Sequence, residues 1–279
     1  MSARLSAALC LCLILACASA ARAEAPPRIL AGTTLVADVL RDLCPQGAEI
    51  RVLIPGGACP GHFDLKPGDL ALVQDARAVI LHQWQKDMAA MRNLLRAAQN
   101  EALDADYLPE PENPMLPAGQ LALTRAVQDA LQRRFPAWSG HVRARAEARA
   151  ARIQAVEQEL LAAFAPLHAA RPAALCSALQ APLARWAGLQ VAMTYGRPEE
   201  LTPGRVAALL EAGRAAGVSL VIDNIQSGVG AGRGLAEELG ARQIDLTSFP
   251  GALDGADTWE DALRANARLL LAAAGEPRP

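Results

Sequence analysis

The sequence predicts an α/β protein of two lobes, each with a roughly four-stranded parallel sheet and flanking helices, joined by one long rigid helix. Two observations predict this class. Short apolar runs alternate with helical patterns in both halves of the chain, which is typical of parallel sheets with right-handed crossovers. Between the halves, one helical pattern continues without a break. We therefore expect a signal peptide at 1–23, an N-terminal lobe at 27–137, a connecting helix at 138–168 and a C-terminal lobe at 169–279.

The first 23 residues have the pattern of a secretory signal peptide. Arg4 gives a short basic start, an uncharged apolar core runs from Ala7 to Ala18, and small residues follow as a cleavage site. The apolar run is too short to span a bilayer comfortably. We expect a periplasmic protein, with a lipid anchor at Cys17 as the alternative because the preceding residues resemble a lipobox.

The predicted elements follow in the order of the chain. Apolar runs in the first half predict three strands and a weaker fourth, at 28–32, 50–54, 77–81 and 103–108. Helical patterns between them predict helices at 35–43, 67–75 and 87–98. The second half repeats the scheme, with strands expected at 173–176, 189–194, 218–222 and 243–246. Its helices are expected at 179–186, 203–216, 235–239 and 259–274.

The connecting helix is predicted to begin at Ser139, a residue type that caps helix N-termini. The pattern then runs to about Leu167, with no glycine or proline between Gly140 and Pro166. Apolar residues step along it by three and four, which predicts one buried stripe made of Ile153, Val156, Leu160, Phe164 and Leu167. The segment Pro109–Pro117 is read as a loop.

Charge and cysteine usage exclude some functions. Cleavage would remove Arg4 and Arg22 from the 27 basic residues, leaving 25 against 29 acidic ones and a net charge of −4. We therefore expect no binding to nucleic acid, which favours a basic face. Three cysteines remain after cleavage, Cys44, Cys59 and Cys176. Either Cys44 pairs with Cys59 in a disulfide, or a ligand holds Cys59 and Cys176 as thiolates.

The loop Pro55–Asp69 (PGGACPGHFDLKPGD) follows a predicted strand and carries Cys59 and His62 three residues apart. A thiol and an imidazole on one loop can turn toward a single metal ion. The alternative is that Cys59 is a small buried hydrophobe and His62 a surface residue. Thiol catalysis would also need a base and an orienting group, for which the sequence gives no context. We therefore expect no enzyme.

Taken together, the motifs resemble those of the periplasmic metal-receptor proteins of zinc and manganese ABC importers, the cluster A-I solute-binding proteins. The chain has Thr33-Thr34 after the first strand, and its loop Pro55–Asp69 is similar to the family's Pro-Gly-x-Asp-Pro-His-x-Tyr-Glu-Pro-x-Pro-x-Asp. Further on, Glu200–Pro203 resembles the family's Glu-Pro-Ser-Pro, and Val221–Gln226 its Phe-x-Glu-x-Gln. The resemblance implies a monomeric receptor that binds a transition metal ion between its lobes and delivers it to a membrane permease.

The resemblance also implies a ligand set, and the chain departs from it. Family members usually use three histidines and one acidic residue as ligands. In this sequence the Asp of the first motif is matched by Cys59 and its His by Gly61, and His62 follows one residue later. Asn113 falls on the second histidine and Cys176-Ser177 on the third motif, while the acidic ligand falls near Asp245–Ser248. The metal candidates are therefore His62, Cys59, His82, Asn113, Cys176 and Asp245, with His82 included because it ends a strand.

These changes affect the expected cargo. The resemblance implies Zn(II) first and Mn(II) second, and the loss of histidine and carboxylate ligands disfavours Mn(II). The alternative cargo is a chelated metal or a small organic ligand, for which Trp84, Asn113, Gln180 and Tyr195 offer aromatic and hydrogen-bonding surface. The glycines at 228, 230, 232 and 234 do not have the spacing of a phosphate-binding loop and are read as a flexible connection.

Overall fold

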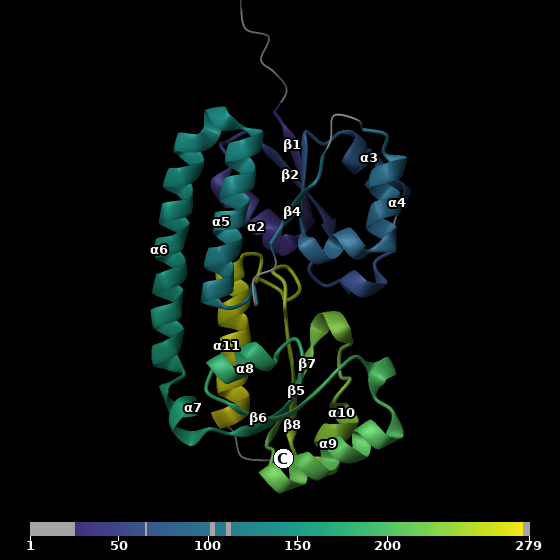
Figure 1. Cartoon of the computed structure of the whole chain (residues 1–279). Coiled ribbons are helices and arrows are strands. Elements are labelled where there is room, and N and C mark those ends of the chain that lie inside the picture. The colour runs from purple at the N-terminus through teal and green to yellow at the C-terminus, as the bar shows by residue number, and fades with distance from the viewer. Residues whose placement is uncertain (1–25, 65, 101–103, 110–112, 276–279) are drawn as a thin grey trace, which may run out of the picture.

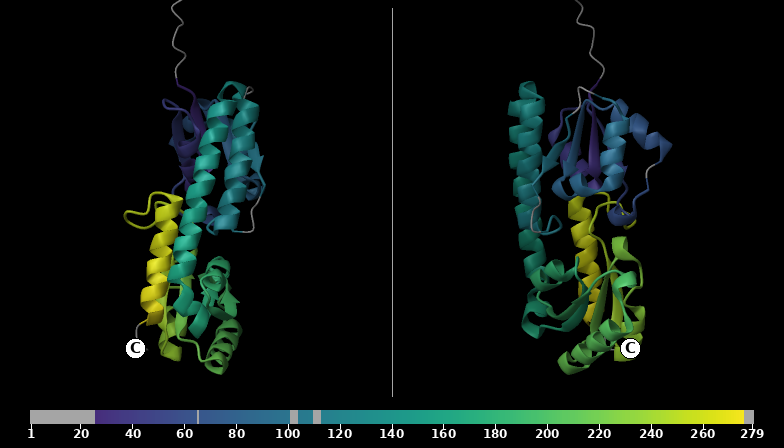
Figure 2. Two further views of the ribbon diagram at one scale, coloured as in Figure 1. Left: turned by 90° about the vertical axis from the view of Figure 1, so that its left-hand side faces the viewer. Right: turned by 45° about the vertical axis from the view of Figure 1, so that its right-hand side comes forward.

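The computed structural model describes residues 26–64, 66–100, 104–109 and 113–275. The expected signal peptide and Cys17 lie outside the described residues. The chain forms two lobes stacked end to end, with α6 running alongside both of them (Figure 1). Two further views show the same arrangement from other sides (Figure 2). Within the described ranges, no helix combines the length and the apolar character needed to cross a membrane.

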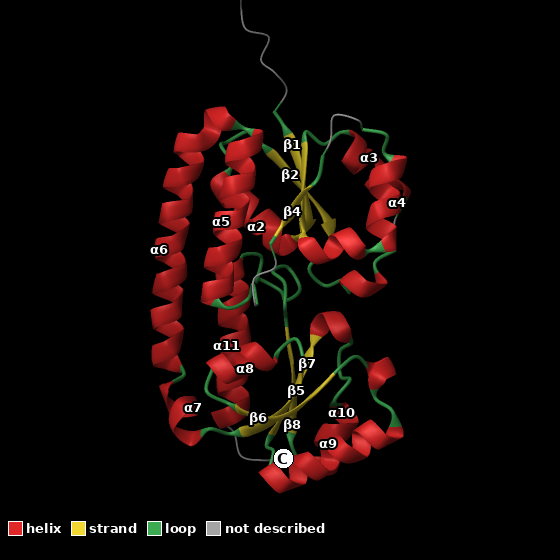
Figure 3. Cartoon of the chain, viewed as in Figure 1, coloured by secondary structure: helices red, strands yellow, loops and turns green. Residues whose placement is uncertain are grey.

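Each lobe is built on a four-stranded parallel sheet, as predicted, with helices packed around it (Figure 3). The first sheet has the order β2-β1-β3-β4, from β1 (Arg28–Thr33), β2 (Glu49–Ile54), β3 (Ala78–His82) and β4 (Asp106–Leu108). The second has the order β6-β5-β7-β8, from β5 (Ala173–Ser177), β6 (Gln190–Tyr195), β7 (Leu220–Asn224) and β8 (Arg242–Leu246). Strands β3 and β7 are buried along their whole length, because helices cover both faces of a parallel sheet.

The helices connect consecutive strands or form a layer along one side of the molecule. The first lobe contains α2 (Thr34–Leu43), α3 (Pro67–Gln74), α4 (Ala89–Ala97) and α5 (Pro117–Arg134). The second contains α8 (Ala181–Trp186), α9 (Pro203–Ala216), α10 (Arg233–Leu239) and α11 (Trp259–Gly275), and α6 (Ser139–Ala163) and α7 (Ala165–Ala170) join the two. Short 3₁₀ turns lie at Pro60–His62 (η1), Gln83–Asp87 (η2), Pro136–Trp138 (η3), Pro198–Glu200 (η4) and Ile225–Ser227 (η5).

The connecting helix is shorter than the sequence predicts. Helix α6 ends at Ala163, and α7 begins at Ala165 after a break at Phe164. Pro166 causes the break, since it has no N–H to donate and is tolerated only in the first turn of a helix, where α7 places it. The predicted stripe is nevertheless confirmed, because all five of its residues are buried. At 1.5 Å per residue, α6 is about 37 Å long, enough to reach both lobes.

Helix α5 is the element that the sequence patterns miss. It begins at Pro117, where the sequence predicts the end of a loop, and pairs with α6 through η3. The stacked rings of Phe135 and Trp138, with centroids 4.2 Å apart, close the connection between the two helices. Proline suits the first turn of a helix, so Pro117 begins α5 rather than ending the loop.

One hydrophobic core extends through both lobes. It includes residues of β1 and α2 in the first lobe, of β5 and β7 in the second, and of α6 and α11. Helix α11 starts against the first lobe, where the Trp259 backbone N–H donates to Asp38 at 3.3 Å and its indole N–H donates to the Met115 carbonyl at 3.1 Å. The buried Arg149 of α6 donates to Asp38 at 2.6 Å. Because α11 contacts both lobes, the lobe boundaries given above stay predictions.

Candidate functional site

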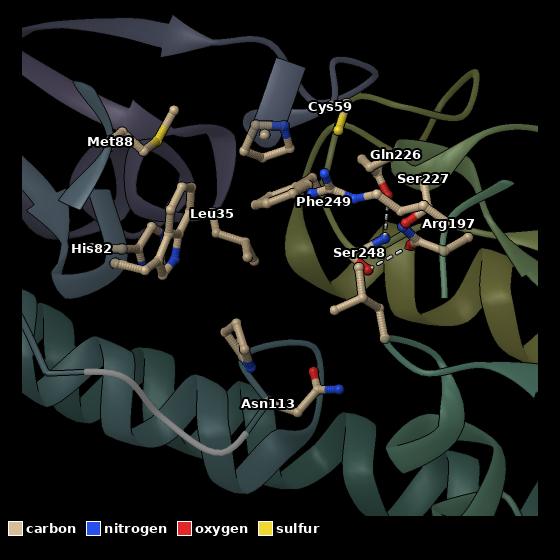
Figure 4. Close-up of a pocket in the computed structure, with 16 residues that line it drawn as sticks. Leu35, Cys59, His82, Met88, Asn113, Arg197, Gln226, Ser227, Ser248 and Phe249 are labelled. Atoms are coloured by element: carbon tan, nitrogen blue, oxygen red, sulfur yellow. Dashed lines mark hydrogen bonds between the residues drawn. The ribbon is translucent and has the colours of Figure 1, made fainter. Parts of the chain in front are cut away.

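A cavity of about 390 Å³ lies between the lobes. It is located at the carboxyl ends of the strands, where open α/β sheets bind their ligands, and each of the eight strands is followed by, or ends in, a residue that lines it. The close-up shows residues of the first lobe facing residues of the second across this space (Figure 4). The lining residues are Leu35, Cys59, Pro60, Gly61, His82, Trp84, Met88, Asn113, Pro114, Leu179, Arg197, Asn224, Gln226, Ser227, Ser248 and Phe249.

His82 ends β3 and is 1% exposed. Its Nε2 is hydrogen-bonded to Thr33 Oγ1 at 2.9 Å, and its ring stacks on Trp84 with centroids 5.5 Å apart. Its Nδ1 is buried without a hydrogen-bond partner in the described structure. Burial lowers the pKa of this imidazole to about 4, because a charged ring loses its hydration there. The ring is therefore neutral near pH 7, which is the form that binds metals.

The loop after β2 brings Cys59 to the cavity and leaves His62 outside it. Cys59 precedes η1 and is partly buried on the cavity wall. The His62 side chain is 65% exposed, and its Nε2 lies 3.8 Å from the Glu199 carboxylate instead of lining the cavity. The two residues, three positions apart, do not converge on one point because η1 turns between them.

The wall formed by the second lobe is a network of amides and hydroxyls. Gln180 Nε2 donates to Asn224 Oδ1 at 2.8 Å and to Ser248 Oγ at 3.0 Å, and Ser248 Oγ donates to Asn224 Oδ1 at 2.7 Å. Asn224 Nδ2 in turn donates to Ser227 Oγ at 2.8 Å. Gln226 Nε2 donates across the lobes to the Gly56 carbonyl at 2.7 Å. The network is neutral and fixes the orientation of these side chains.

Arg197, which follows β6, is the single charged side chain on the cavity wall among the described residues. Its guanidinium packs against the backbone of Gly61, where a Cβ atom would lie 2.4 Å from one terminal nitrogen. No sequence motif points to Arg197. Its position directly after a predicted strand is the one signal that would have placed it at this edge of the sheet.

The remaining candidates from the sequence have different locations. Asn113 lines the cavity, and its Oδ1 accepts a hydrogen bond from the Met115 N–H at 2.8 Å. Cys176, a metal candidate, is instead 0% exposed within the core and does not line the cavity. Asp245 lies off the cavity and accepts a hydrogen bond from the Gly230 N–H at 3.1 Å. Of the six candidates, Cys59, His82 and Asn113 line the cavity, on different sides of it (Figure 4).

The cysteines form no disulfide among the described residues, so the first of the two alternatives, a bond between Cys44 and Cys59, is not present in this structure. Desolvation raises the pKa of the thiol of Cys44, which is partly buried against the core, to about 12. It raises the pKa of the fully buried Cys176 further, because a thiolate loses its hydration there. Neither cysteine is therefore a thiolate at neutral pH without a bound metal.

The glycine-rich segment after β7 is held by carboxylates on the sheet. The Gly232 N–H donates to Asp223 at 2.9 Å, and Tyr195 Oη donates to the same carboxylate at 2.5 Å. A Cβ at Gly232 would lie 2.5 Å from the Val221 side chain, so the close approach requires glycine. The backbone N–H of this segment thus binds the carboxylate of Asp223, not a phosphate. Tyr195, which the sequence offers as a surface for an organic cargo, does not line the cavity.

The donor set does not match a metal cage. In the part of the chain that the structure describes, no three His, Cys, Asp or Glu side chains group as metal ligands. Zinc sites usually have four such donors, or three and an open position. The cavity offers Cys59 and His82, together with neutral amides and hydroxyls. A bare ion would therefore lack ligands here.

Comparison with known proteins gives a family and a fold. The sequence profile of the family described as zinc-uptake complex component A, periplasmic (ZnuA) matches residues 29–273. A crystal structure of ZnuA has a TM-score of 0.72 at 18% identity and covers 89% of this chain and 99% of that one. A periplasmic metal-binding protein from Candidatus Liberibacter asiaticus has a TM-score of 0.71 at 12% identity, with 88% and 99% covered. Its Mn-bound structure has a TM-score of 0.71 at 12% identity, with 88% and 98% covered. No curated protein matches the sequence.

Proposed function

The chain belongs to the ZnuA family of periplasmic zinc-uptake components, and from this premise we propose that it is the exported receptor of an ABC importer. It captures its cargo in the cavity between the lobes and delivers it to a membrane permease. Membership in this family confirms the resemblance found in the sequence motifs, and it also confirms that the chain is a transport protein and not an enzyme. Its action as a monomer stays a prediction.

The observation that supports this proposal is the location of the cavity. Residues that end or follow all eight strands line one space of about 390 Å³, which is within the size range of small-ligand sites. Both lobes contribute to it, so a bound cargo contacts both at once.

The proposed cargo is a transition metal, Zn(II) first, that arrives in complex with its own chelator. Two features favour the complex over the bare ion. The wall supplies Cys59 and His82 but no third thiol, imidazole or carboxylate among the described lining residues. The cavity is also large for an ion, because one water in the liquid takes up about 30 Å³. A chelator would supply the missing ligands and fill the remaining volume.

A small organic ligand without metal is the second candidate, since the same neutral and apolar walls would hold it. Thiol catalysis has less support. Neither histidine is bonded to Cys59 as a base: His62 is exposed and off the cavity, and the Nε2 of His82 is hydrogen-bonded to Thr33 instead. A nucleophilic thiol needs such a base.

The test is the composition of the mature protein purified without added chelator. We expect Zn(II) and a small molecule in equal amounts with the protein, measured by elemental analysis and by mass spectrometry of the extracted ligand. Ser227→Trp, which places a large side chain on the cavity wall, should lose both. Val229→Trp is the matched control, because Val229 is 66% exposed on the same lobe and should keep both. Metal without a small molecule would contradict the chelate, and neither in any preparation would contradict the receptor.

A further inference from the structure

Arg197 is a charge without a counter-charge on the wall of the cavity. Its guanidinium forms no hydrogen bond or ion pair with any described residue, whereas its backbone carbonyl accepts from the Glu200 N–H at 2.9 Å. The acidic residues nearest in sequence do not neutralise it, since Glu199 instead lies beside His62. A guanidinium is always protonated and offers five N–H donors in a planar fork. Such a group, partly buried and unpaired, is suited to an anion with planar oxygens.

The guanidinium packs against the backbone of the opposite lobe. A Cβ at Gly61 would lie 2.4 and 2.8 Å from its two terminal nitrogens and 3.0 Å from its central carbon. Gly61 is the position that the family resemblance matches to the first histidine ligand. The chain therefore places a positive charge where a metal-binding side chain would begin. That charge repels a bare divalent cation and attracts an anion.

The rest of the wall is suited to an organic body attached to such an anion. Leu35, Trp84 and Phe249 present apolar surface, and Leu179 is 54% exposed at the cavity. Asn113 uses its Oδ1 to accept from Met115, and its Nδ2 makes no hydrogen bond with a described residue. A ligand with one anionic end and a less polar body would satisfy these groups together.

From these contacts we propose that Arg197 is the anion-recognition residue of the receptor, and that the cargo presents a carboxylate to it. This inference rests on the proposed function, because it assigns the chemical class of the cargo held in the same cavity. The carboxylate has two sources, the chelator of a zinc complex or an organic acid without metal. Both would form the same paired hydrogen bonds with the guanidinium.

The experiment measures binding by calorimetry to three sets of probes. These are Zn(II) alone; citrate, malate and histidine alone; and the same three acids premixed with Zn(II). We expect the wild type to bind at least one acid or its zinc complex more tightly than Zn(II) alone. Arg197→Met should raise that Kd roughly 10- to 100-fold, the range expected for hydrogen bonds to a charged group. The arm that binds more tightly identifies the source of the carboxylate.

Matched variants separate recognition from folding. Arg214→Met changes the same residue type on an exposed part of the same lobe and should leave the Kd unchanged. Gly61→Ala should displace the guanidinium and weaken binding, whereas Gly57→Ala, on the same loop, meets no atom within 4 Å and should not. Thermal unfolding of each variant checks that it is folded.

Two results would overturn the inference in distinguishable ways. Tight binding of Zn(II) alone, equal in the wild type and in Arg197→Met, would refute the carboxylate and leave the metal receptor in place. If neither Zn(II) nor any acid or complex binds the wild type, the proposed function fails together with the inference.

Discussion

Replacement of His82 by glutamine tests the physical description of the cavity wall. The folded imidazole has a pKa of about 4, against 6.5 for the ordinary residue. In the window between these values the unfolded chain binds a proton that the folded chain does not, so the free energy of unfolding falls as the pH is lowered. Each pKa unit corresponds to about 1.4 kcal/mol. This difference in pKa therefore lowers the free energy of unfolding by about 3 kcal/mol between pH 7 and pH 4.

The assay is urea unfolding of the wild type, His82→Gln and His62→Gln at about pH 7, 5.5 and 4. The glutamine amide can still reach Thr33 Oγ1, and its constant effect on stability cancels when only the change with pH is compared. We expect the wild type to lose about 3 kcal/mol more than His82→Gln over this range. His62→Gln should follow the wild type, because the His62 side chain is 65% exposed.

The reasoning is refuted if the wild type and His82→Gln lose the same stability between pH 7 and pH 4. That result would mean that the imidazole is hydrated or paired in the folded protein, in disagreement with its 1% exposure and unpartnered Nδ1. The comparison requires similar urea dependence of the unfolding free energy in the variants, which the slope of each curve reports.

Three further predictions follow from the packing. Arg149→Met should lower the free energy of unfolding by about 3–5 kcal/mol, because it leaves the Asp38 carboxylate buried without its cation. Urea unfolding measures this loss, and a second substitution in the same chain, Asp38→Asn, should recover part of it. Gly119→Ala should destabilise the fold and weaken cargo binding, since its Cβ would lie 1.9 Å from the Asn113 carbonyl oxygen; thermal unfolding and calorimetry check the two effects. Cys176 is 0% exposed, so alkylation followed by mass spectrometry should modify it only at the rate of unfolding.

The elements that depend on short-range patterns are predictable from the sequence. Strands β3 and β7 lie within one or two residues of their expected positions, because both of their faces are buried and give the sequence a continuous apolar run. Helix α5 is missed since Pro117 has the same local appearance at the end of a loop as in the first turn of a helix.

The site is less predictable, because it depends on which face each side chain occupies. Cys176 and Ser177 are neighbours on β5, so their side chains point to opposite faces of the sheet, and a motif match alone does not say which one meets the cleft. Cys176 belongs to the core. Arg197 belongs to no motif, and its role at the cavity depends on Gly61 of the other lobe, 136 positions away in the sequence. Such a contact exists only in the folded chain.

The core that the two lobes share has a consequence for the proposed transport. Because α6 and α11 hold both lobes, a receptor of the proposed kind would lose little conformational entropy when its cargo enters. Its affinity would then be set mainly by the rate of escape. Release into the proposed permease would require work done on the receptor from outside, and nucleotide hydrolysis by the importer could supply it.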